Sequence, residues 1–294
     1  MTLTTQREGK VQAPGGNVWY KIEGDGPGVP LLLLHGGPGA GHDYLEPMAT
    51  LGDDRPVVFY DQLGCGKSDK PDDASLWQIQ RFVEELAVVR RALGLGRVHL
   101  LRQSWGGWLA IEYLLGKHAG VASLTLSNTS ASARGFEEGA KRRVGGLPED
   151  VRQTIERCEA DGATDSPEYT MASFTFMQAH VCRIQPWPDY LMRTGANVQT
   201  TPTYAHMWGP SEFTMTGNLS TWDRRARLGE IDVPALVVSG PYDEAAPELA
   251  EELHVGIRGS EKVMIDETSH TPWIENPDAF FSVLRDFLRR NEPA

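Results

Sequence analysis

The sequence predicts an α/β protein in which helices cover both faces of a mostly parallel central sheet and a helical cap is inserted into the chain. Short, continuous apolar runs alternate with segments of helical periodicity before residue 132 and again after residue 222. Apolar runs of this length are typical of strands buried on both faces, as in a parallel sheet. Strands that alternate with helices in this way predict a parallel sheet between two helical layers.

The elements expected in the first part of the chain follow one another in this alternating order. Strands are expected at 18–22, 29–34, 56–60, 98–101 and 121–126, and helices at 44–51, 79–93 and 106–115. The helix at 79–93 carries its charges on one side and ends at Gly94 and Gly96, residues that suit a helix C-terminus.

The alternation breaks between about Ala133 and Trp222, where helical pieces, prolines, aromatic residues and methionines replace the strands. We interpret this stretch as a helical cap whose aromatic side chains form its own core or line a pocket. Strands are expected again at 234–238 and 262–265, and helices at 249–257 and 278–290. The predicted organisation is a core of residues 1–132 and 223–294 with a cap of residues 133–222.

Composition limits the kinds of partner. The 294-residue chain has a formal net charge of −12 and a pI near 5.1, which argues against nucleic acid or an anionic membrane as a partner. Its three cysteines form no Cys-x-x-Cys pair, so neither a disulfide framework nor a zinc cluster is indicated. The first residues lack a signal-peptide core, and no apolar run is long enough to span a bilayer. We expect a cytoplasmic protein, monomeric by default, that uses no cofactor or metal.

An apolar strand ends at Ser104, and a helical segment begins directly behind it. This order is typical of a nucleophile elbow, Gly-x-Ser-x-Gly, in which a strained strand-to-helix turn lifts the serine hydroxyl above the sheet. Arg102 stands where the pattern has its first glycine. Small residues are needed there because the strand and the helix nearly collide, so Arg102 requires an explanation.

Two further residues complete a catalytic triad. Asp243 and His270 each follow an expected strand, as Ser104 does, and the order Ser, Asp, His is that of the α/β-hydrolase fold. In this chemistry His270 takes the proton of Ser104, Asp243 orients the imidazole, and the serine attacks an acyl carbon. Taken singly, the three residues are a turn serine, a helix cap and a loop histidine. Their shared position at strand ends favours the triad.

A glycine-rich turn, HGGPG at 35–39, follows the strand at 29–34 and is typical of the loop that completes an oxyanion hole. We expect an N–H group of Gly36 or Gly37 to act together with the Trp105 N–H on the developing oxyanion. His35 is expected to form structural hydrogen bonds rather than to act as a base.

Three motifs resemble those of the proline iminopeptidase family of serine peptidases, which includes the tricorn-interacting aminopeptidase and L-amino-acid amidases. They are HGGPG at 35–39, YDQLGCG at 60–66 and QSWGG at 103–107, and the similarity extends over nearly the whole chain. The resemblance implies a hydrolase that releases an N-terminal residue, preferably proline or a small apolar one. It implies a small peptide, amino-acid amide or arylamide as substrate.

Two more segments resemble the family, WGPSEF at 208–213 and YDE at 242–244. In the family these segments carry glutamates that bind the free amino terminus of the substrate, so the resemblance implies ammonium anchors at Glu212 and Glu244. A substrate ammonium would relieve the repulsion between two converging carboxylates. From the residues alone, a structural role is equally open: a helix cap or surface ion pair for Glu212, and the positive end of a helix for Glu244.

Arg102 departs from the family pattern, and three explanations are open. The elbow tolerates the arginine by turning its side chain away from the serine, the arginine reshapes the pocket for a specialised substrate, or it distorts the elbow and weakens activity. The nearest alternative function is an esterase or amidase acting on another small acyl compound in specialised metabolism. A third hypothesis, motivated by Arg102, is a non-catalytic ligand-binding protein of the same fold.

Overall fold

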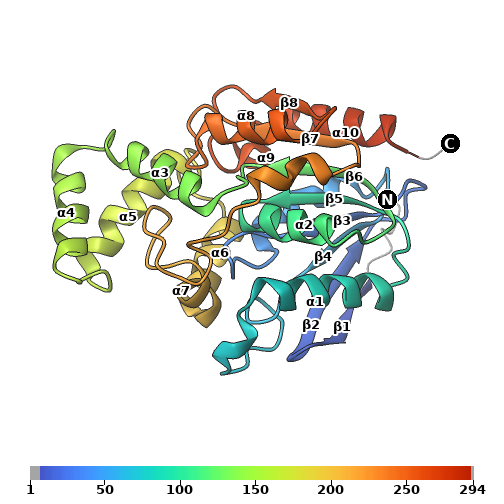
Figure 1. The fold of residues 1–294 in the computed structure, drawn as a ribbon, viewed down its shortest axis with the longest axis horizontal. Helices are drawn as coiled ribbons and strands as arrows, with labels where there is room; N and C mark the ends of the chain where they lie inside the picture. Colours follow the sequence, from blue (N-terminus) through green and yellow to red (C-terminus); the bar gives the residue numbers. More distant parts are fainter. Residues whose placement is uncertain (1–6, 293–294) are drawn as a thin grey trace.

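The computed structural model describes residues 7–292, which form one eight-stranded sheet with helices around it (Figure 1). The strand order is β1-β2-β4-β3-β5-β6-β7-β8; β2 pairs antiparallel with β1 and β4, and all other neighbours are parallel. The strands are β1 (Arg7–Ala13), β2 (Gly16–Glu23), β3 (Leu31–Leu34), β4 (Val57–Tyr60), β5 (Val98–Gln103), β6 (Val121–Ser127), β7 (Ala235–Ser239) and β8 (Glu261–Met264). The predicted α/β fold with a mostly parallel sheet is confirmed.

Helices cover both faces of the sheet because successive side chains of a strand point to opposite sides. In β3, Leu32 and Leu34 belong to the apolar core shared with α1 and α2, whereas Leu31 and Leu33 belong to the core shared with η1 and α10. The helices that cover the sheet are η1 (Asp43–Leu51), α1 (Ile79–Ala92), α2 (Trp105–Leu115), α8 (Pro247–Gly256), α9 (Pro272–Glu275) and α10 (Pro277–Arg290).

The chain between β6 and β7 is helical and lies to one side of the sheet (Figure 1). Its helices are α3 (Ala133–Val144), α4 (Glu149–Ala160), α5 (Pro167–His180), α6 (Asp189–Thr200) and α7 (Pro202–Met207). The Asn197 side-chain amide donates to the carbonyl oxygen of Ala40 at 3.2 Å, and the Thr201 hydroxyl donates to that of Gly64 at 2.6 Å. These bonds attach the inserted helices to the loops that follow β3 and β4.

Five elements differ from the sequence-based expectations. β1 was not expected, because this strand lies at the edge of the sheet and is mostly polar and exposed, so it has no apolar run. The segment expected as a helix at 44–51 is the 3₁₀-helix η1, which contains Pro47, a residue without a backbone N–H. The one-turn α9 and two short 3₁₀-helices, η2 (Ala74–Leu76) and η3 (Arg225–Glu230), were also not expected. Within residues 7–292, no helix combines the length and apolar character needed to cross a bilayer.

Candidate active site

Ser104 lies in the turn between β5 and α2 with φ 53° and ψ −128°, a backbone conformation that a residue with a Cβ rarely adopts. The turn is tight because the helix starts against the neighbouring strand end. A Cβ atom on Gly106 would lie 2.4 Å from the carbonyl oxygen of Leu34, and one on Gly107 would lie 2.4 Å from the Thr129 hydroxyl oxygen. Glycine at both positions therefore allows the sharp strand-to-helix turn that the sequence predicts.

Arg102 is completely buried on the opposite side of the sheet from the cavity at Ser104. Its neighbour Gln103 lines that cavity, and Arg102 points instead toward Tyr60 of β4, Arg90 of α1 and Tyr113 of α2. The only hydrogen bond described for its guanidinium is a long one, 3.5 Å from Nη1 to the Leu32 carbonyl oxygen, and Nε and Nη2 have no described partner. Burial lowers the pKa of this guanidinium well below its usual value.

Asp243 follows β7 and His270 follows β8, so both lie at the carboxyl edge of the sheet with Ser104. His270 Nδ1 and Asp243 Oδ1 are 2.6 Å apart, and both side chains are buried. The second oxygen of Asp243 accepts from the Asn128 side-chain amide at 2.7 Å, and the Ala245 N–H donates to the first at 2.9 Å. These bonds fix the carboxylate and, through it, the plane of the imidazole.

Asn128 is a site residue that the sequence reasoning missed. It follows β6 directly, has φ 55°, and donates a second hydrogen bond to the Ser269 carbonyl oxygen at 2.9 Å. It therefore ties the Asp243 loop to the loop that carries His270. Its place at the end of a parallel strand, at the edge where Ser104 lies, is the signal that points to it.

Glu212 and Glu244 converge on the same cavity as Ser104 and His270. Glu244 Oε1 lies 3.2 Å from His270 Nε2, and its Oε2 has no described partner. Glu212 Oε1 accepts from the Tyr204 hydroxyl at 2.8 Å. Burial raises the pKa of Glu212, and burial together with the charges of Glu212 and Asp243 raises the pKa of Glu244 well above its ordinary value. A cation placed between the two carboxyls would stabilise their ionised forms.

The glycine loop after β3 lies against Ser104, since a Cβ on Gly36 would come 3.0 Å from the Ser104 Cβ. The Gly36 N–H donates to the Tyr44 hydroxyl at 2.7 Å, and Gly37 has φ 104°. Buried His35 accepts from the Gln62 N–H at 3.0 Å through Nε2, and its Nδ1 lies 3.0 Å from the Gly36 carbonyl oxygen. Burial lowers the pKa of His35, and both ring nitrogens hold the loop in place.

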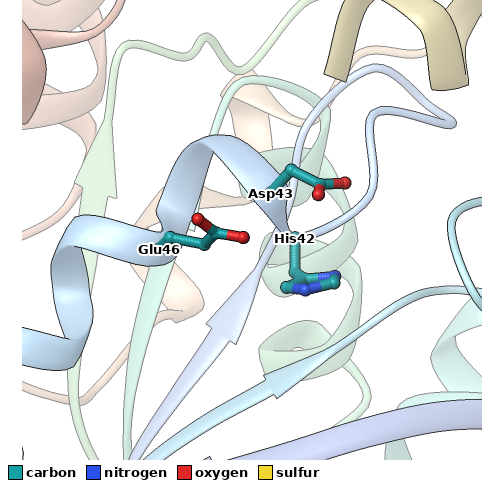
Figure 2. A group of neighbouring side chains, drawn as sticks. All are labelled: His42, Asp43 and Glu46. Carbon is teal, nitrogen blue, oxygen red and sulfur yellow. The ribbon is translucent and has the colours of Figure 1, made fainter. Parts of the chain in front are cut away.

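His42, Asp43 and Glu46 form a group of metal-type ligands at the start of η1 (Figure 2), with one ligand atom of each within 4.8 Å of the others. Their described partners are protein groups. His42 Nδ1 lies 2.9 Å from Asp61 Oδ1. Arg193 of α6 donates to Asp43 Oδ1 at 2.8 Å and to Glu46 Oε1 at 2.6 Å. The two carboxylates thus hold an inserted helix to the core through a guanidinium.

Comparison with known proteins places this geometry in a family. The model of the alpha/beta hydrolase fold matches residues 29–277. A proline iminopeptidase of Heyndrickxia coagulans is 43% identical over 282 residues, which cover 96% of this chain and 98% of that protein. One from Lactobacillus acidophilus is 37% identical, with 97% and 99% covered.

Two solved structures are also similar to this chain over nearly its whole length. The proline iminopeptidase of Mycobacterium smegmatis superposes with a TM-score of 0.89 at 35% identity, and VinJ with a TM-score of 0.93 at 35% identity. Each comparison covers 97% of this chain and 98% of the other. The chain belongs to the proline iminopeptidase family of α/β-hydrolases.

Proposed function

We propose that the protein is a serine aminopeptidase that releases an N-terminal residue, preferably proline or a small apolar one, from peptides, amino-acid amides or arylamides. The observation that carries the proposal is one cavity lined by Ser104, His270, Glu212 and Glu244. A serine and a histidine supply acyl-transfer chemistry, and two buried carboxyls supply a place for a substrate ammonium. The relatives named proline iminopeptidase support the same activity.

In this mechanism Ser104 is the nucleophile, His270 is the base and Asp243 orients the imidazole. The serine attacks the scissile carbonyl, His270 passes the proton to the leaving amine, and the acyl-enzyme forms. Water then attacks the acyl carbon with His270 as base. We assign the oxyanion hole to the N–H groups of Trp105 and Gly37, because the Gly36 N–H is already bound to the Tyr44 hydroxyl.

The substrate ammonium is bound between Glu212 and Glu244, and it also changes the hydrogen bonding of the base. Before substrate binds, Glu244 is 3.2 Å from His270 Nε2, the nitrogen that must accept the serine proton. An ammonium that draws the Glu244 carboxylate to itself frees Nε2 for Ser104. The free amino group therefore contributes to both binding and turnover.

Residues 1–132 and 223–294 form the α/β-hydrolase core of the protein. Residues 133–222 act as a cap that closes the site. The cap supplies Glu212, and α5 and α6 supply much of the cavity wall. We place the acidic protein in the cytoplasm as a monomer, and cell fractionation and size-exclusion chromatography test these two points.

The test is a panel of aminoacyl arylamides, each with a free and an N-acetylated amino group. Leaving a buried charge unpaired costs about 3–5 kcal/mol, so N-acetylation should lower kcat/KM by about 10²- to 10⁴-fold. Ser104→Ala is the control and should abolish turnover of the free substrates. Equal turnover of free and blocked substrates would instead favour an esterase or amidase with no need for the amino group. Failure of a fluorophosphonate to label Ser104 in the folded protein would favour a non-catalytic role.

A further inference from the structure

The cavity at Ser104 extends well beyond the catalytic groups. Its volume is about 320 Å³, and Ser104, His270 and the two glutamates form only part of its lining. Much of the remaining wall comes from α5, α6 and the segment between them. The apolar side chains there are Phe174, Met177, Val181, Trp187, Leu191 and Met192.

Apart from His270, the charged side chains that line this cavity are acidic. No lysine or arginine is among its described lining residues, and the charged side chains there are Glu212, Glu244 and, when protonated, His270. Two arginines lie close in sequence to the lining residues, and both have other partners. Arg193 donates to carboxylates of η1, and the Arg183 guanidinium lies over the Tyr242 ring, 3.7 Å from its centroid. A carboxylate in this cavity would therefore be desolvated without a cationic partner.

The covalent structure of an aminoacyl substrate places its parts along the cavity. Two bonds separate the α-nitrogen from the scissile carbonyl carbon, so a residue whose ammonium lies at Glu212 and Glu244 is confined between these glutamates and Ser104. The group on the other side of the scissile bond must then lie against the remaining wall. Much of that wall is the apolar surface of α5, α6 and the segment between them.

We propose that this apolar wall is the leaving-group subsite, and that it selects substrates whose leaving amine is bulky, apolar and uncharged over dipeptides with a free α-carboxylate. This inference rests on the proposed aminopeptidase function and specifies its substrate class. Neutral amides, arylamides and alicyclic amides of an N-terminal residue fit the subsite. A dipeptide brings its carboxylate into an acidic, apolar cavity.

The first test compares two substrates that differ in one charge, prolyl-leucine and prolyl-leucine amide. Both have the same acyl residue and the same leaving side chain. We expect kcat/KM for the amide to exceed that for the acid by at least about tenfold, as expected when a buried charge has no partner. Equal values, or a preference for the acid, would overturn the inference.

The second test adds a cation to the subsite. Met192 of α6 lines the cavity and is 53% exposed, so Met192→Lys places an ammonium at the mouth without burying it. Met171 of α5 is 73% exposed and is not among the lining residues, so Met171→Lys is a matched control with the same change of charge. We expect Met192→Lys to lower the ratio of amide to acid about tenfold and Met171→Lys to leave it unchanged.

The outcomes separate this inference from the proposed function. If the ratio of amide to acid falls equally in the two lysine variants, the effect comes from net charge, and the subsite assignment is wrong. A larger response of Met192→Lys to the acyl residue than to the leaving group would assign the wall to the acyl side chain and overturn it as well. If the protein hydrolyses prolyl arylamides but shows no preference between acid and amide, only the subsite fails. If it hydrolyses no free aminoacyl arylamide, the aminopeptidase function itself fails.

Discussion

Removing Glu244 should change activity in opposite directions on two kinds of substrate. Glu244 Oε1 lies 3.2 Å from His270 Nε2, and the same carboxyl is the proposed anchor of the substrate ammonium. Glu244→Ala removes both interactions. The reaction with a neutral ester that has no amino group should become faster, because the base is free to accept the serine proton. The kcat/KM for an aminoacyl arylamide should fall, because its ammonium has lost one of the two carboxylates that bind it.

The size of each effect follows from the geometry. A hydrogen bond to a charged group is worth about 1.5–3 kcal/mol net, and 1.36 kcal/mol corresponds to tenfold in rate. Water that enters the space left by the side chain returns part of this hydrogen bonding. We therefore expect Glu244→Ala to raise the acylation rate by p-nitrophenyl acetate about tenfold. Removing one partner of a buried charge pair should lower kcat/KM for prolyl p-nitroanilide by about 10²-fold or more.

The assay measures the p-nitrophenol burst with the ester and steady-state release of p-nitroaniline from the arylamide. Glu251→Ala is the control, because Glu251 is an exposed carboxylate of α8 paired with Lys262 on the surface. It should leave both rates within about twofold of the parent. A slower or unchanged ester reaction in Glu244→Ala would refute the reasoning. So would an equal gain in Glu212→Ala, because the gain would then come from lost acidic charge rather than from a freed His270.

Three further predictions concern stability and the orientation of the triad. Arg102→Met removes buried nitrogens without described partners while keeping most of the volume, so Tm should rise by about 2–6 °C in calorimetry, and a lower Tm would contradict this. Because the pKa of Glu244 is raised on folding, the contribution of its carboxyl to stability is complete below about pH 4.3 and is lost as pH rises through the folded value. The Tm of Glu244→Gln minus that of the parent should therefore increase from pH 4 to pH 8. A difference that stays constant over this range would argue against a buried, ionising carboxyl. Asn128→Ala should lower kcat about tenfold in steady-state assays, since the Asp243 carboxylate loses a 2.7 Å hydrogen bond, and an unchanged kcat would show that Asn128 does not position it.

The buried strands could be predicted from the sequence because their apolar runs are unambiguous. β3, β4 and β7 are short, mainly apolar runs buried throughout, and such runs have few alternative structures. β1 was missed because it is an edge strand with a polar, exposed face. η1 was expected as an α-helix because its apolar spacing fits both helix types, whereas Pro47 favours the irregular one.

The candidate site was predictable as far as it depends on topology. Ser104, Asp243 and His270 each follow a strand of the parallel part of the sheet, so strand order alone brings them to one edge. The contact between Glu244 and His270 was not predictable, since it depends on side-chain directions in two loops. The direction of Arg102 was also open, and its position on β5 next to Gln103 shows why the elbow accommodates it: adjacent strand residues face opposite sides.

The backbone at Ser104 has a consequence for how this protein balances durability against reactivity. With φ 53° and ψ −128°, the residue occupies a region that costs a side-chain-bearing residue about 1–3 kcal/mol and costs glycine little. We expect Ser104→Gly to relax the turn and stabilise the fold while it removes the proposed nucleophile. Serine at position 104 therefore keeps a strained backbone in the folded state at the residue that we propose as the nucleophile, and the packing of helices on the sheet must offset that cost.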